Sequence, residues 1–119
     1  MPVVVSEQGS QRIRERMKTP EQELVQRIDK RQCVLIATRA EGGTPAQYFV
    51  VWDEIAQEPF LVIVEVFRGS RSIRTVYQTR HLHSRKHGVI VRQDHIEKAV
   101  HRLTSGNTRH QAQEEKAQR

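Results

Sequence analysis

The sequence predicts an α+β fold, a small antiparallel meander sheet of four to five strands with an N-terminal and a C-terminal helix packed on one face. Two observations lead to this fold class. Short runs of β-branched and aromatic residues, separated by turn residues, fill the middle of the chain, and apolar residues at helical spacing flank them on both sides. With 119 residues, of which 36% are hydrophobic, the chain has the size of one domain.

The N-terminal residues 1–18 are predicted to be a weakly ordered arm or a short helix. They are mostly polar, and after Ser10 only Ile13 and Met17 stand at helical spacing. Gly9 lowers the helix propensity of this stretch further. The single α+β domain is therefore expected to span 19–105.

A helix is expected over about 20–31. Thr19 is a suitable N-cap, Pro20 suits the first helical position, and Gln22 can complete a capping box. The apolar residues of this helix share one face, which is expected to pack on the sheet; they are Leu24, Val25 and Ile28.

The middle of the chain predicts the strands. Residues 33–38 are apolar on both faces, which is typical of a central strand and makes Cys33 an inert core thiol. Residues 48–52 and 60–67 predict two further strands, and 89–91 predicts a short last one.

A tight hairpin is expected after the 60–67 run. Gly69 and Ser70 fit its two-residue loop, and the returning strand is expected over about 72–80. This register places Glu65 directly opposite Arg74, so that the two form a cross-strand ion pair. The alternative is that burial raises the pKa of Glu65 and makes it a general base.

The strongest helix signal lies near the C-terminus. Asp94 and Glu97 have the spacing of a capping box, and Gly106 ends the helical pattern. The remaining residues 106–119 are almost entirely polar and predict a disordered tail. The apolar stripe of the helix consists of Ile96, Ala99, Val100 and Leu103.

The positive charge of the chain is concentrated in residues 68–92. The net charge is +6 and the isoelectric point is near 10.1. The segment 68–92 contains seven basic residues and no Asp or Glu, whereas elsewhere 13 basic residues face 14 acidic ones. Because guanidinium groups bind phosphates bidentately, the segment predicts a nucleic-acid-binding protein that contacts the phosphate backbone of RNA or DNA. The expected contacts are Arg68, Arg71, Arg74, Arg80, Arg85, Lys86 and Arg92.

Two other functions fit the same segment. One is a metal-independent ribonuclease, in which His81 or His83 moves protons and Arg74, Arg80 or Arg85 stabilises the charged transition state. Glu65 is a further catalytic candidate. In outline, the helix followed by an antiparallel sheet with basic strands resembles the small ribonuclease toxins of the RelE and barnase-like groups. The other function is that of an interaction or inhibitor protein of mobile-element type, which would bind an acidic protein surface.

Several classes of protein are not expected. His81, His83 and His87 stand among basic residues that repel a dication, so neither a metal nor another cofactor is predicted. The single cysteine excludes an intramolecular disulfide. No apolar run approaches the roughly 18 residues of a membrane span, and the first residues do not predict a secretory signal, so a cytoplasmic location is expected. Exposed sheet edges are compatible with a homodimer.

Overall fold

The computed structural model describes residues 2–40, 44–79, 85–86 and 89–105, with the backbone alone for 85–86 and 89–90. The expected tail 106–119 therefore lies outside the described residues. The helices within the described part are α1 (Glu7–Arg16), α2 (Glu21–Asp29) and α3 (Gln93–Thr104). The strands are β1 (Val3–Val5), β2 (Val34–Arg39), β3 (Ala46–Asp53), β4 (Glu58–Phe67), β5 (Ser70–Gln78), β6 (Arg85–Lys86) and β7 (Val89–Ile90).

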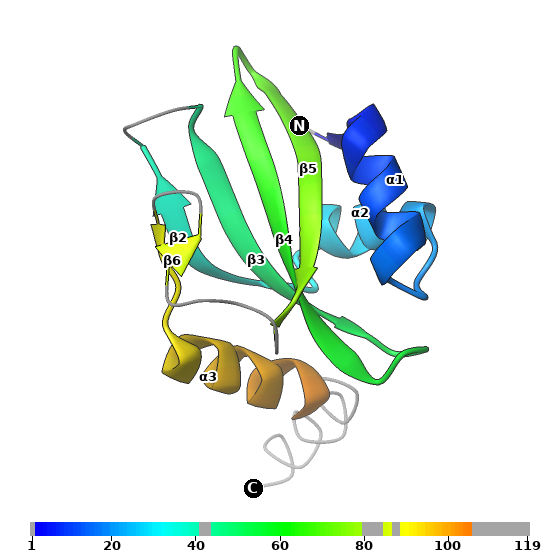
Figure 1. Cartoon of the computed structure of the whole chain (residues 1–119), viewed down its shortest axis with the longest axis vertical. Helices are drawn as coiled ribbons and strands as arrows, with labels where there is room; N and C mark the ends of the chain where they lie inside the picture. The colour runs from blue at the N-terminus through cyan, green and yellow to red at the C-terminus, as the bar shows by residue number, and fades with distance from the viewer. Residues whose placement is uncertain (1, 41–43, 80–84, 87–88, 106–119) are drawn as a thin grey trace, which may run out of the picture.

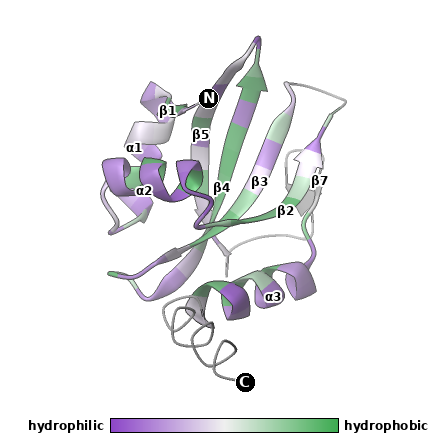
Figure 2. Ribbon diagram, turned by 180° about the vertical axis from the view of Figure 1, so that it is seen from behind, coloured by the Kyte–Doolittle hydropathy of each residue, from purple (hydrophilic) through white to green (hydrophobic). Residues whose placement is uncertain are grey.

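The predicted α+β class is confirmed. Strands β2 to β5 form an antiparallel meander, as expected, and β1 pairs in parallel with β5, which makes a mixed sheet of order β1-β5-β4-β3-β2 in the described residues (Figure 1). β6 and β7 form a separate two-stranded ribbon. Hydrophobic residues are concentrated along β4, the middle strand of the sheet (Figure 2).

The expectation that the helices share one face of the sheet is wrong. Helices α1 and α2 pack on one face, against a cluster that includes Phe49 and Val51, and α3 packs on the other, against Tyr48 and Val50. Side chains alternate along a strand, so β3 presents apolar residues to both faces of the sheet. Both faces therefore need a helical cover, and the two ends of the chain supply one each.

The expectation that residues 33–38 form a central strand is also wrong. β2 lies at the edge of the sheet, and Leu35 is 47% exposed. β2 is apolar for a reason other than a central position: Val34 and Ile36 pack into the cluster beneath α3. Just before β2, burial raises the pKa of Cys33 to about 11, an effect that Arg71 opposes, so this thiol is protonated at neutral pH.

The N-terminal residues, expected as a weakly ordered arm or short helix, form β1 and α1. Ser6 joins the two elements: its Oγ accepts from the N–H of Gly9 at 2.9 Å and donates to the carbonyl of Ile73 at 3.0 Å. The helix lies so close to β5 that a Cβ at position 9 would stand 2.2 Å from the carbonyl oxygen of Ile73. Glycine is thus required here by a close backbone approach and not by its flexibility.

The predicted capping boxes do not form. The N-cap of α2 is Pro20, and Thr19 instead donates its hydroxyl to Asp53 at 2.8 Å. In α3 the N-cap is Arg92, whose guanidinium binds the carboxylate of Asp94. In both cases a tertiary or side-chain partner competes with the local cap. The apolar stripe predicted for α3 is confirmed, since Ile96 and Ala99 are buried and Val100 and Leu103 pack beside them.

The buried carboxylate of Asp53 fixes the connection between α1 and α2 by hydrogen bonds. It is 0% exposed and accepts hydrogen bonds from the N–H groups of Lys18, Thr19, Ile55 and Ala56 at 2.8–3.1 Å. Burial by itself raises the pKa of Asp53, but the hydrogen bonds from Ala56, Lys18 and Thr19 outweigh it and hold this pKa below its ordinary value.

Candidate nucleic-acid interface

The turn of the β4–β5 hairpin carries the first of the expected phosphate contacts, Arg68. The loop consists of Arg68 and Gly69, with φ of 49° and 78°, and Phe67 pairs with Ser70. Two positive φ values are the requirement of a type I′ turn. The predicted loop of Gly69 and Ser70 is therefore wrong by one residue, because arginine rarely adopts a left-handed conformation and the pattern gave no sign that it does so here.

A bulge in β5 changes the expected cross-strand pairing. Val64 pairs with Ile73 and Ile63 with Thr75, so Arg74 is the extra residue of the irregularity. Glu65 consequently stands opposite Ser72, and the predicted register is wrong. The predicted ion pair nevertheless forms, with Nε of Arg74 3.8 Å from Oε1 of Glu65.

Glu65 lies between two guanidinium groups. Besides Arg74, it has Nη2 of Arg39 at 3.8 Å from its Oε2. Arg39 is fixed by two N–H groups that donate to the carbonyl of Thr44 at 3.0 and 2.8 Å. The side chain of Arg39 is 15% exposed, that of Glu65 29% and that of Arg74 50%, so Arg74 is the member of this cluster that is most open to a ligand. One carboxylate between two guanidiniums leaves the cluster with a local excess of positive charge.

The end of the hairpin also exposes an aromatic ring. Phe67 is 59% exposed, and the guanidinium of Arg68 lies 5.2 Å from its ring centroid. Such an arrangement is a cation–π contact. It places a positive charge and an exposed aromatic face side by side at the tip that projects beyond the rest of the sheet in Figure 1.

The other expected contacts are distributed along the chain. Arg71 lies on β5 and donates from Nη2 to Oε1 of Gln47 at 3.3 Å. Arg92 lies at the start of α3, at the opposite end of the molecule from the hairpin tip, and forms an ion pair of 3.0 Å with Asp94 (Figure 1). The structure therefore brings Arg68, Arg71 and Arg74 onto one hairpin and leaves Arg92 apart from them.

The rest of the predicted site falls largely outside the described residues. This holds for Arg80, His81 and His83. Arg85 and Lys86 form β6, whose backbone pairs with β7 near β2 (Figure 1). Sequence reasoning missed Arg39, although it directly follows the predicted strand 33–38, because no local pattern shows that the end of that strand reaches Glu65 across β3.

A metal site was not expected, and His81, His83 and His87 lie outside the residues that the structure describes. Among those that it does describe, no three His, Cys, Asp or Glu side chains gather closely enough to hold a metal ion. In the same part of the chain, no helix has the length and apolar character needed to cross a membrane.

Comparisons with known proteins give no relative of this chain: no protein-family model, no curated protein and no solved structure matches it. Its function has to be inferred from its own residues.

Proposed function

We propose that the protein binds nucleic acid, with the arginines of segment 68–92 contacting the phosphate backbone. One observation carries this proposal. The end of the β4–β5 hairpin exposes Arg68, and further along β5 the exposed Arg74 shares the carboxylate of Glu65 with Arg39. Arg71 lies on the other face of the hairpin, beside Gln47. A phosphate approaching this hairpin thus meets guanidinium groups whose charge exceeds that of the single carboxylate among them.

The shape of the hairpin supports the same function. A two-stranded β-ribbon is narrow enough to enter the major groove of a duplex. The exposed ring of Phe67 beside Arg68 offers a face on which an unpaired base can stack. Both RNA and DNA remain targets of the proposal, since the contacts are with phosphates, which the two share.

Binding of a fluorescein-labelled oligonucleotide at low salt tests the proposal. In the double variant Arg68→Asn/Arg74→Ser two cations are removed, and asparagine before Gly69 retains a sequence favoured in type I′ turns. The matched control is Lys18→Ser/Lys30→Ser, which removes two exposed cations at the ends of α1 and α2. We expect weaker binding for the hairpin variant and wild-type binding for the control. Equal losses in the two variants would show that only net charge matters and would overturn the assignment to the hairpin.

A second function, cleavage of RNA without a metal, is supported by the geometry around Glu65. A carboxylate flanked by guanidiniums at 3.8 Å can accept the proton of a ribose 2′-hydroxyl while Arg74 binds the adjacent phosphate. The 2′-oxygen would attack phosphorus, the bond to the 5′-oxygen would break, and the leaving oxygen would take a proton from His81 or His83. The products would be a 2′,3′-cyclic phosphate and a free 5′-hydroxyl.

Incubation of labelled RNA with the protein in EDTA tests this second function. Glu65→Gln keeps the shape of the side chain and removes the base, so cleavage should be lost while binding is retained. Wild-type protein that binds RNA and leaves it intact would exclude catalysis and keep the binding function.

A further inference from the structure

A groove runs between α3 and the edge strand β2, on the part of the molecule away from the hairpin tip. Its volume is about 300 Å³, and it is lined by Val34–Ile36 of β2 and by His95, Lys98, Ala99 and Arg102 of α3. The wall formed by β2 is apolar, and the wall formed by the helix carries nitrogen-bearing side chains above the small Ala99. The groove therefore combines an apolar floor with a basic rim.

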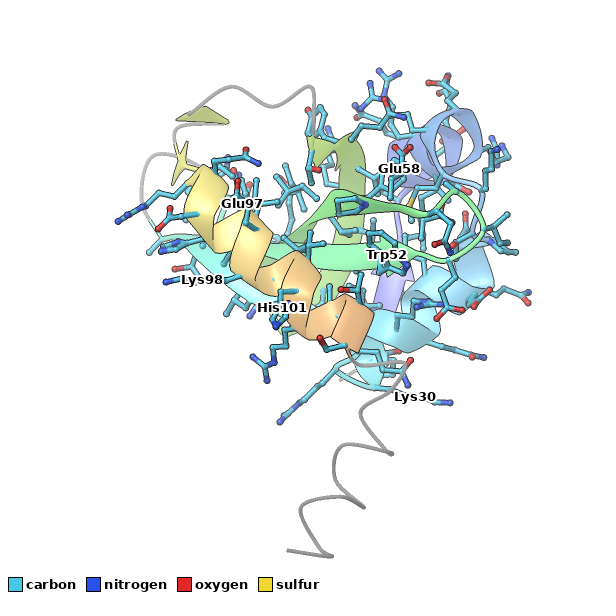
Figure 3. All side chains as sticks on the ribbon, turned by 90° about the horizontal axis from the view of Figure 1, so that it is seen from below. Lys30, Trp52, Glu58, Glu97, Lys98 and His101 are labelled. Atoms are coloured by element: carbon cyan, nitrogen blue, oxygen red, sulfur yellow. The ribbon has the colours of Figure 1, made fainter. Side chains whose placement is uncertain are left out.

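The cations of the rim have no acidic partner in the described residues. Lys98 and Arg102 are exposed, and within the part of the chain that the structure describes neither forms an ion pair. None of the described residues that line the groove is a carboxylate, and Glu97 projects from α3 on the side away from Lys98 (Figure 3). The groove is thus complementary in charge to an acidic ligand.

β2 is one of the two edge strands of the described sheet. In that sheet it is hydrogen-bonded to β3 alone; β7 lies near β2 but pairs with β6, and Leu35 is 47% exposed beside the groove. An edge strand offers a row of N–H and C=O groups with which an extended peptide can pair, while pockets beside it accept alternate side chains. The groove stands where such side chains would enter.

We propose that this groove binds an extended acidic peptide segment of a partner protein, which pairs with β2 as an additional strand and places its carboxylates on Lys98 and Arg102. A nucleic acid fits less well, because phosphates gain nothing from the apolar wall of Val34–Ile36. A second copy of this chain fits less well too, because pairing of β2 with β2 would bring two basic rims together. The peptide site lies apart from the hairpin proposed for nucleic acid.

Fluorescence anisotropy with a labelled decapeptide of alternating aspartate and valine tests the proposal. We expect the wild-type protein to bind this peptide saturably. It should not bind a peptide in which lysine replaces aspartate. Lys98→Ser/Arg102→Ser should weaken binding about tenfold, as the loss of two exposed charge pairs predicts. The equal-charge control Lys18→Ser/Lys30→Ser should bind as wild type does. Leu35→Asp places a carboxylate beside the groove and should abolish binding.

Amide hydrogen exchange locates the peptide independently of these variants. Binding of the probe should protect backbone amides of Val34–Ile36 and leave those of the β4–β5 hairpin unchanged. Protection at the hairpin, or equal affinity of the two charge-reduced variants, would overturn the proposal. Oligonucleotide binding gives a further test. If Lys98→Ser/Arg102→Ser weakens it as much as Arg68→Asn/Arg74→Ser does, the groove belongs to the nucleic-acid interface and the proposal is overturned. Protection of β2 in the free protein, together with dimer formation, would assign the edge to a second copy.

Discussion

Arg74 forms an ion pair with Glu65 across 3.8 Å, although Glu65 stands opposite Ser72 in the hairpin. The bulge in β5 accounts for the difference, because it shifts the strand by one residue and leaves Arg74 without a paired position. With Arg39 on its other side, Glu65 becomes the acidic centre of a cluster that spans three strands.

A double-mutant cycle measures what this ion pair contributes to the fold. Half of the Arg74 side chain is exposed, so solvent screens the attraction. We expect a coupling free energy between Glu65→Gln and Arg74→Ser of about 0.2–1 kcal/mol in urea unfolding. A coupling of several kcal/mol would show that the cluster holds the hairpin together. A value in the expected range leaves Arg74 available for a ligand without large cost to stability.

Substitution of Gly9 by alanine should destabilise the protein by about 1–3 kcal/mol, as overpacking does. In an exposed helix the same change stabilises by about 0.5–1 kcal/mol, since alanine is the better helix former. Here the added Cβ would meet the carbonyl oxygen of Ile73 at 2.2 Å, and α1 must move away from β5. A decrease in the free energy of unfolding would therefore confirm the close approach of α1 to β5, and an increase would contradict it. Gln8→Ala, at the exposed neighbouring position, is the control and should be nearly neutral.

Asp53→Ala should destabilise the protein by about 2–4 kcal/mol, because it leaves several buried N–H donors without an acceptor. The donors belong to Lys18, Thr19, Ile55 and Ala56. Chemical unfolding monitored by circular dichroism gives the value. A loss below about 0.5 kcal/mol would mean that water replaces the carboxylate without penalty.

The lowered pKa of Asp53 predicts a pH dependence of stability. A carboxyl group whose pKa is lower in the folded than in the unfolded state stabilises the fold above its unfolded pKa of 3.8. This contribution is lost as the pH falls below that value and the folded-state group takes up a proton. The free energy of unfolding should therefore fall more steeply with acid in the wild type than in Asp53→Asn, which cannot titrate. Parallel curves for the two proteins between pH 5 and about pH 2 would contradict the prediction.

Features set by neighbouring residues along the chain could be predicted from the sequence, and features set by distant partners could not. The strand predicted at 48–52 and the apolar stripe of α3 rest on local patterns, and both are confirmed. β1 was not predicted, because three valines after Pro2 indicate a strand only once β5, more than 60 residues away, offers its edge. The cap at Thr19 failed for the same reason, since the distant Asp53 accepts its hydroxyl. The cap at Asp94 failed locally, because the neighbouring Arg92 binds its carboxylate.

The candidate site was predictable in composition and not in geometry. The absence of carboxylates in 68–92 is visible in the sequence, and so is the suitability of Glu65 for an arginine partner. The approach of Arg39 depends on how β2 and β3 pair, and the position of Arg74 depends on a bulge. Neither has a sequence signal as clear as hydrophobic periodicity, because a bulge changes the backbone by a single residue.

The salt dependence of nucleic-acid binding tests the whole basic segment. Each neutralised phosphate contributes about 0.9 to the slope of log affinity against log salt on a duplex and about 0.7 on a single strand. A strand and loop cannot direct all seven basic residues of 68–92 to one side, so we expect about three to five contacts and a slope of roughly −2 to −5. Arg80, Arg85 and Lys86 changed together to serine should flatten the slope by about two to three units. The ion pair of Arg92 with Asp94 predicts a smaller effect of Arg92→Ser. Wild-type protein that shifts neither RNA nor DNA at low salt would contradict the binding function, would exclude the ribonuclease function with it, and would leave recognition of an acidic protein as the role of the basic surface.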